Sequence, residues 1–114
     1  MPQALALVLS IAIEAVVAFF AMRALGWGSG RRVALAATIG TLITHPIIWQ
    51  GIPRLEPALG YGAAVALAEG AVVLAESIAY RLIVPLAWPR SLAVSAIANG
   101  ASAGAGLAYY ALTG

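Results

Sequence analysis

The sequence predicts an all-α polytopic membrane protein: one domain, residues 1–114, folded as a compact bundle of four transmembrane helices. The composition predicts this class, because 63% of the residues are hydrophobic and 9% are charged, far from the average of soluble domains. The few charged and helix-breaking residues also divide the chain into four apolar segments, each of about twenty residues or more, which is long enough to cross roughly 30 Å of hydrocarbon. A water-soluble fold and a disordered chain are both excluded.

The first span is predicted over residues 3–22 and the second over residues 33–50. Between them lie Arg23 and residues 26–30, which include three glycines and favour a turn. Residues 1–3 include no basic side chain. We therefore expect the first span to be a retained helix rather than a cleaved secretory signal.

The third span is predicted over residues 58–84 and the fourth over residues 91–112. Gly51, Pro53 and Pro57 are expected to break the chain before the third span, because glycine and proline are the strongest local helix breakers. Further prolines separate the third span from the fourth. No connection is long enough to hold a soluble domain.

The arginines are distributed unequally between the connections. The second connection carries Arg54, partly offset by Glu56, whereas the first and third carry Arg23, Arg31, Arg32, Arg81 and Arg90. Basic residues in short loops are retained on the cytoplasmic side of a membrane. We therefore expect both termini on the outer side. The expected location is the inner (plasma) membrane of a bacterium or archaeon.

Polar and ionisable side chains lie well inside the predicted spans, where they are costly and usually functional. The candidate ion- or substrate-binding residues are Glu14, Thr41, His45, Glu69, Glu76, Tyr80 and Asn99. Residues three, four and seven apart share a helix face, so each span has one polar face, and we expect the four polar faces to meet in the interior. Tyr80 is equally well explained as an aromatic anchor at the membrane boundary, and Asn99 as a contact between helices.

The depths of these residues predict a short polar track. His45 and Glu69 are expected somewhat outside the midplane, and the other deep residues, Glu14, Thr41, Glu76 and Asn99, somewhat inside it. The two groups should be separated by at most about 10 Å, or two helical turns.

Three glutamates in the membrane, with no lysine or deep arginine beside them, cannot neutralise one another. Either they hold protons or they share a bound cation. His45 suits the outward position because imidazole exchanges protons near neutral pH. A histidine with carboxylates also suits a divalent metal ion, for which the candidate ligands are Glu14, His45, Glu69 and Glu76.

Two further features concern helix shape and packing. Pro46 follows His45 and cannot donate to the carbonyl of Leu42, so we expect a helix kink that either lines a polar cavity or only shapes the packing. In the fourth span, Ala96, Gly100 and Gly104 form a ridge of small residues. Such ridges favour close contact with a neighbouring helix, in the same chain or in a second copy.

The length, the four spans and Glu14 resemble the small multidrug resistance transporters, which are four-helix proteins with one essential glutamate in the first helix. Glu14 looks like that glutamate. The rest of the chain lacks the aromatic pattern of that family's drug site, and it has two further acids and a Thr-His-Pro sequence that the family does not explain. The resemblance is one of architecture, and no drug-binding residue is carried over.

Three classes of function remain, in descending order of support. The first is proton- or cation-linked transport of an unidentified substrate, the second an accessory or assembly subunit of a larger membrane complex, and the third an intramembrane metal-dependent enzyme. Enzyme activity therefore stays undecided, with the weight of the sequence against it. The expected partners are the lipid bilayer and either a second copy of the chain or a larger complex, with no nucleic acid. The chain has no cysteine, which excludes disulfides and thiolate chemistry.

Overall fold

The computed structural model describes residues 3–113, and for Tyr110 it describes only the backbone. Met1 and Pro2, part of the segment expected to precede a retained helix, lie outside the described residues, as does Gly114. The structure confirms an all-helical bundle that is 92% helical, with no strand in the described part of the chain. Its helices are α1 (Gln3–Leu25), α2 (Gly30–Leu59), α3 (Tyr61–Ile83) and α4 (Trp88–Thr113). All four are long and apolar enough to cross a membrane.

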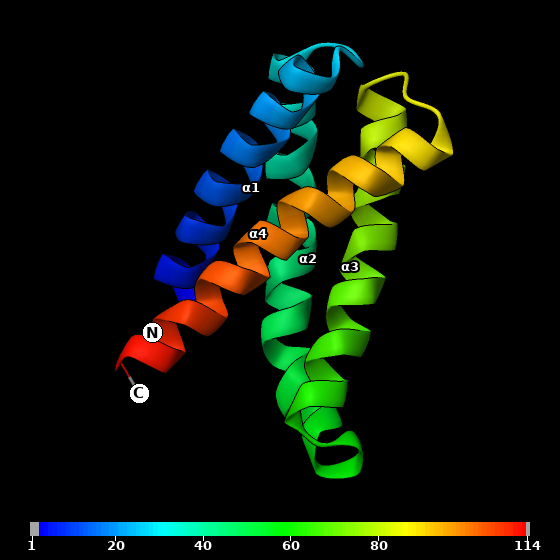
Figure 1. Cartoon of the computed structure of the whole chain (residues 1–114). Coiled ribbons are helices and arrows are strands. Elements are labelled where there is room, and N and C mark those ends of the chain that lie inside the picture. Colours follow the sequence, from blue (N-terminus) through cyan, green and yellow to red (C-terminus); the bar gives the residue numbers. More distant parts are fainter. Residues whose placement is uncertain (1–2, 114) are drawn as a thin grey trace.

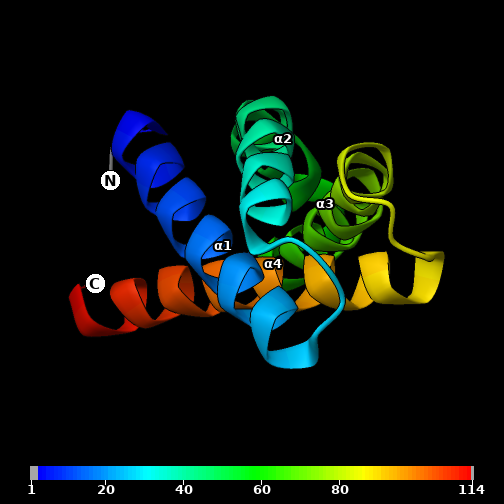
Figure 2. The same cartoon turned by 90° about the horizontal axis from the view of Figure 1, so that it is seen from above.

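The four helices form a ring in which α1 and α3 each pack against both α2 and α4 (Figure 1). The α1–α2 and α3–α4 connections lie at one end of the bundle. This arginine end carries Arg23, Arg31, Arg32, Arg81 and Arg90. The opposite end holds the α2–α3 turn at Gly60 and the beginning of α1 and the end of α4, and is here called the Gly60 end. Seen from above, α4 extends across α2 and α3, which are viewed nearly end-on (Figure 2).

The reversal between α2 and α3 corrects one prediction. Gly51, Pro53 and Pro57 do not break the chain: α2 continues past residue 50 to Leu59. Each proline removes only one N–H donor, and the remaining residues complete the helical hydrogen bonds, as in many membrane helices. The reversal occurs at Gly60, whose φ of 81° is readily adopted only by glycine and whose N–H donates to the carbonyl of Glu56 at 2.7 Å.

Most other helix ends extend past their predicted positions, whereas α3, at Tyr61–Ile83, is shorter than the predicted residues 58–84. α2 begins at Gly30 because Ser29 caps it: the Arg32 N–H donates to Ser29 Oγ at 3.2 Å. α4 begins at Trp88 rather than at residue 91, since Pro89 occupies the first turn, where a missing N–H leaves no hydrogen bond unmade. α2 continues through Pro46, and the kink there stays a prediction.

The arginine half of the bundle is closely packed. Its buried core combines the larger side chains Met22, Val33, Tyr80, Val84 and Val94 with several alanines. A Cβ added at Gly30 would lie 2.8 Å from the Phe19 ring, so α1 and α2 approach closely there. Towards the Gly60 end, α1 and α4 diverge from α2 and α3 (Figure 1). The helices are therefore closely packed at one end and spread apart at the other.

The small-residue ridge of α4 makes no close contact inside the chain. Ala96, Gly100 and Gly104 are exposed, and no atom would lie within 4 Å of a Cβ built at Gly100 or Gly104. The prediction that this ridge packs against a neighbouring helix of the same chain is therefore wrong. The physical reason is that α4 crosses the bundle obliquely and turns its serine and asparagine face, rather than its glycine face, towards α3.

Candidate functional site

A cleft of about 340 Å³ lies in the Gly60 half of the bundle, lined by residues of all four helices. Its walls are mostly apolar, with Leu9, Ile13, Ile48, Ile52 and Val65 among them. Its polar and aromatic lining residues are Ser10, His45, Trp49, Tyr61, Glu69, Ser102 and Tyr109. The cleft therefore suits a mainly apolar guest that has a few hydrogen-bonding groups.

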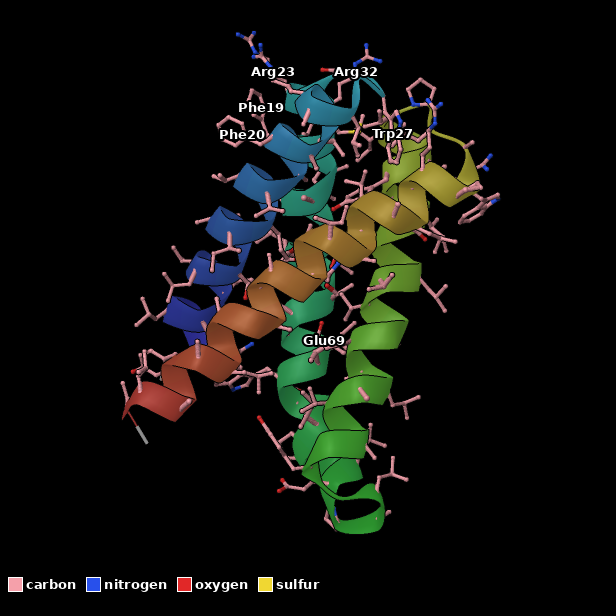
Figure 3. The ribbon with its side chains drawn as sticks, viewed as in Figure 1. Phe19, Phe20, Arg23, Trp27, Arg32 and Glu69 are labelled. Carbon is pink, nitrogen blue, oxygen red and sulfur yellow. The ribbon has the colours of Figure 1, made fainter. Side chains whose placement is uncertain are left out.

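A second, smaller cavity of about 40 Å³ lies next to the cleft. This inner cavity is lined by Glu14, Thr41, Glu76 and Asn99, none of which lines the cleft. It is large enough for water, since a cavity of about 10–15 Å³ on this measure holds one molecule. His45 and Glu69 border both spaces and so stand between them. Figure 3 shows Glu69 about halfway along the bundle, on the α3 side.

Two neighbouring carboxyl groups are the main feature of the inner cavity. The side chains of Glu14 and Glu76 are 3% and 1% exposed, and they contact each other. The Thr41 hydroxyl donates to Glu76 Oε1 at 3.4 Å, a long hydrogen bond, and Thr41 also contacts Glu14. Glu14 Oε1 and Glu76 Oε2 are buried and have no hydrogen-bond partner among the described residues. The pair is therefore enclosed but incompletely hydrogen-bonded.

No arginine is available to neutralise this pair. Five of the six arginines are at the arginine end, and Arg54 lies near the far end of α2, in the Gly60 half. In a medium of low dielectric constant, two adjacent carboxylates repel each other strongly and lose their hydration. Two ionised carboxylates at this position are therefore costly, and a proton or a cation would relieve their repulsion.

The backbone of α2 comes close to Glu76 because residue 40 is a glycine. A Cβ at Gly40 would lie 2.8 Å from Glu76 Cγ, closer than real Cβ contacts. The Thr44 hydroxyl donates to the Gly40 carbonyl at 2.9 Å, so the neighbouring threonine turns back onto its own helix. The sequence interpretation missed Gly40. The signal that could have found it is a small residue adjoining Thr41 on the polar face of α2.

Asn99 is held beside Glu76 by Ser95. Asn99 Nδ2 donates to the Ser95 carbonyl at 2.9 Å and to Ser95 Oγ at 3.3 Å. Ser95 Oγ in turn donates to the Val73 carbonyl at 2.9 Å, which joins α4 to α3. This chain of bonds fixes the amide of Asn99 in the wall of the inner cavity.

His45 is oriented by a ring contact within α2. Its imidazole stacks on Trp49, one helical turn away, with ring centroids 5.7 Å apart and planes inclined by 26°. His45 is half-buried, and its Nδ1 has no hydrogen-bond partner in the described part of the chain. This nitrogen is therefore a buried polar atom without a hydrogen-bond partner at the junction of the two spaces. Trp49 and Tyr61, both in the cleft wall, were not among the candidate site residues.

Tyr80 lies in the packed core on the arginine side of the carboxyl pair. It is 0% exposed, its hydroxyl has no hydrogen-bond partner among the described residues, and it lines neither cavity. The alternative interpretation of Tyr80 as an anchor at the membrane boundary is wrong, because its ring packs against buried side chains of the neighbouring helices.

The four candidate metal ligands do not come together as a metal site. Within residues 3–113, no three His, Cys, Asp or Glu side chains are placed so that they could hold one metal ion. Glu14 and Glu76 line only the inner cavity, whereas His45 and Glu69 stand at its junction with the cleft. The reason is geometric, because the four side chains come from three helices and are spread along the bundle axis.

The structure thus gathers six of the seven candidate residues around the two spaces and leaves Tyr80 outside. Their role in binding an ion or a solute stays a prediction. No protein family, curated protein or solved structure matches this chain.

Proposed function

We propose that this chain is an integral membrane protein that carries protons, or a small cation in their place, in exchange for or together with a small solute that occupies the cleft. The observation that carries the proposal is the adjacent, buried pair Glu14 and Glu76, which has no arginine beside it. Such a pair gains or loses a positive charge more readily than it stays doubly ionised. It is therefore suited to load and unload a proton.

The two spaces supply a route to this pair. In the proposal, the solute enters the cleft, and His45 and Glu69 exchange protons between the cleft and the inner cavity. The packed core of the arginine half closes the other side. A site near the middle of a bundle that has a cleft in one half and a packed core in the other suits alternating access, in which each side is exposed in turn.

Membrane orientation and assembly belong to the same proposal. The four helices are apolar enough to cross a bilayer, and the arginine asymmetry favours the arginine end on the cytoplasmic side, with both termini outside. The membrane would be the plasma membrane of a bacterium or archaeon. The open ridge at Gly100 and Gly104 supports close approach of a second copy, which gives a homodimer.

Liposomes containing the purified protein and an internal pH-sensitive dye test the proposal. An imposed pH gradient should acidify the lumen of liposomes with the parent protein, and Glu14→Gln and Glu76→Gln should reduce the rate to that of protein-free liposomes. Glu56→Gln is the matched control, because Glu56 is exposed near the end of α2 and should keep the parent rate. A second arm replaces the pH gradient with a sodium gradient, to detect a cation in place of protons.

A different outcome would contradict the proposal. If both Gln variants match the parent in proton and sodium movement, the carboxyl pair is structural. The accessory-subunit interpretation then replaces transport.

A further inference from the structure

We propose that the arginine end is a docking surface for the phosphate groups of anionic phospholipids. This surface consists of Arg23, Arg31, Arg32, Arg81 and Arg90, and all five side chains are exposed. It is separate from the cleft and does not depend on what the cleft carries.

The charge of this surface has no compensating acid nearby. Glu14, Glu69 and Glu76 lie inside the spans, and Glu56 lies near the opposite end of α2. Figure 3 shows Arg23 and Arg32 projecting beyond the helices, well separated from Glu69 along the bundle axis. The alternating helix directions concentrate the charge, because they bring the last turns of α1 and α3 together with the first turns of α2 and α4. An anionic partner therefore meets uncompensated positive charge across the whole end.

Aromatic rings orient three of the five guanidinium groups. Arg81 Cζ lies 4.6 Å from the centroid of the Trp88 ring, and Arg90 Cζ lies 5.1 Å from that of Trp27. A third contact, between Arg23 and the Phe19 ring, measures 5.7 Å. A guanidinium that stacks by its face keeps its N–H edge free, and that edge matches the spacing of two phosphate oxygens.

Two of these contacts also join separate parts of the fold. Arg81 belongs to α3 and Trp88 begins α4, whereas Arg90 of α4 reaches Trp27 in the α1–α2 connection. The guanidinium groups of Arg81 and Arg90 are therefore each held against a separate part of the bundle. Preorganised donors lose less entropy when they bind.

The surface next to the arginines identifies the phosphate as that of a lipid. Leu82, which follows Arg81, is 82% exposed, and Phe20, three residues before Arg23, is 63% exposed. These side chains offer acyl chains an apolar surface directly beside the guanidinium groups, and tryptophan favours the same interfacial depth. An anionic phospholipid covers both parts.

Spin-labelled phosphatidylglycerol and phosphatidylcholine in reconstituted vesicles test this inference. Electron paramagnetic resonance measures the fraction of each label that the protein immobilises, and hence their relative association constants. We expect the parent to prefer phosphatidylglycerol, and the double variant R81Q/R90Q to weaken binding by about five-fold for each arginine that contacts the lipid. Arg54→Gln is the control with the same charge change per residue, since Arg54 lies outside this surface and should leave the preference unchanged.

Three outcomes would overturn the inference: no preference for phosphatidylglycerol in the parent, an equal loss in R54Q and R81Q/R90Q, or displacement of the labelled lipid by inorganic phosphate at the same ionic strength. Circular dichroism checks that each variant is folded. If R81Q/R90Q does not fold, R23Q and R32Q repeat the comparison with residues whose side chains project from the bundle. The preference of the parent protein decides the inference in either case.

Discussion

Replacing Gly40 of α2 with alanine should disturb the carboxyl pair, because Gly40 packs against Glu76 of the neighbouring helix α3. The added Cβ would lie 2.8 Å from Glu76 Cγ and 3.4 Å from Glu76 Cδ and Oε1. Glu76 is 1% exposed, and the inner cavity that it lines measures only about 40 Å³, so its side chain can retreat only a short way. The Cγ atom is in the middle of the side chain, and moving it shifts the whole carboxyl group.

The expected magnitude combines two opposing effects. Overpacking a well-packed interior costs about 1–3 kcal/mol, whereas alanine stabilises a helix interior by about 1 kcal/mol relative to glycine. Gly40→Ala should therefore lower the free energy of unfolding by about 0–2 kcal/mol. The stabilisation that alanine gives a helix cancels when the variant is compared with another Gly→Ala change in the middle of a helix. Gly70→Ala is that comparison, because Gly70 is an exposed residue of α3 with no atom within 4 Å of a Cβ built on it.

The differences in the free energy of unfolding can be measured by unfolding each protein with sodium dodecyl sulfate in mixed micelles. Circular dichroism and tryptophan fluorescence follow the transition. We expect Gly70→Ala to match or exceed the parent and Gly40→Ala to fall about 1–3 kcal/mol below Gly70→Ala. In liposomes, the same Gly40 variant should slow proton entry, because Glu76 has moved away from Thr41. If Gly40→Ala is as stable as Gly70→Ala, α2 does not approach Glu76 as closely as the structure indicates, and the reasoning fails.

Three further changes test separate parts of the structure. Tyr80→Phe removes a buried hydroxyl with no hydrogen-bond partner among the described residues, so the free energy of unfolding should stay unchanged or rise by up to about 1 kcal/mol; a clear loss would mean that the hydroxyl has a partner. Ser95→Ala removes the bond to the Val73 carbonyl and should lower the unfolding free energy by about 0.6–1.5 kcal/mol, whereas no loss would show that this bond does not hold α4. Cysteines introduced at Ser29 and Thr113 should react with a membrane-impermeant reagent from opposite sides of the membrane, and labelling of both from one side would refute the topology.

The helical architecture could be predicted because its signals are local. Apolar runs of spanning length, the arginine asymmetry and the glycine-rich segment after Arg23 are each visible in a short window of sequence, and the structure has four helices where four spans were predicted. The boundary errors at Pro53 and Pro57 arose from treating proline as a stop. A proline removes one hydrogen bond, but a full reversal of the chain needs a backbone conformation that only Gly60 supplied.

The candidate residues could be predicted individually, because a charged or polar side chain inside an apolar span is conspicuous in any window. Their grouping was only partly predictable. Helical periodicity placed Glu76 and Tyr80 on the same face of α3, yet Glu76 lines the inner cavity whereas Tyr80 is enclosed in the core. Periodicity gives the direction of a side chain, and it does not say how far along the helix the neighbouring helices stay packed.

By itself, the sequence determined that the chain forms four apolar helices, that one end carries most of the arginines, and that acids without basic partners lie within the spans. Only the tertiary structure decided that Glu14 and Glu76 are neighbours, that Gly40 lets α2 approach Glu76, and that a cleft lies in the Gly60 half. The reason is physical. Hydropathy and helix length depend on residues close together in the chain, whereas contacts between helices depend on where and at what angle those helices cross.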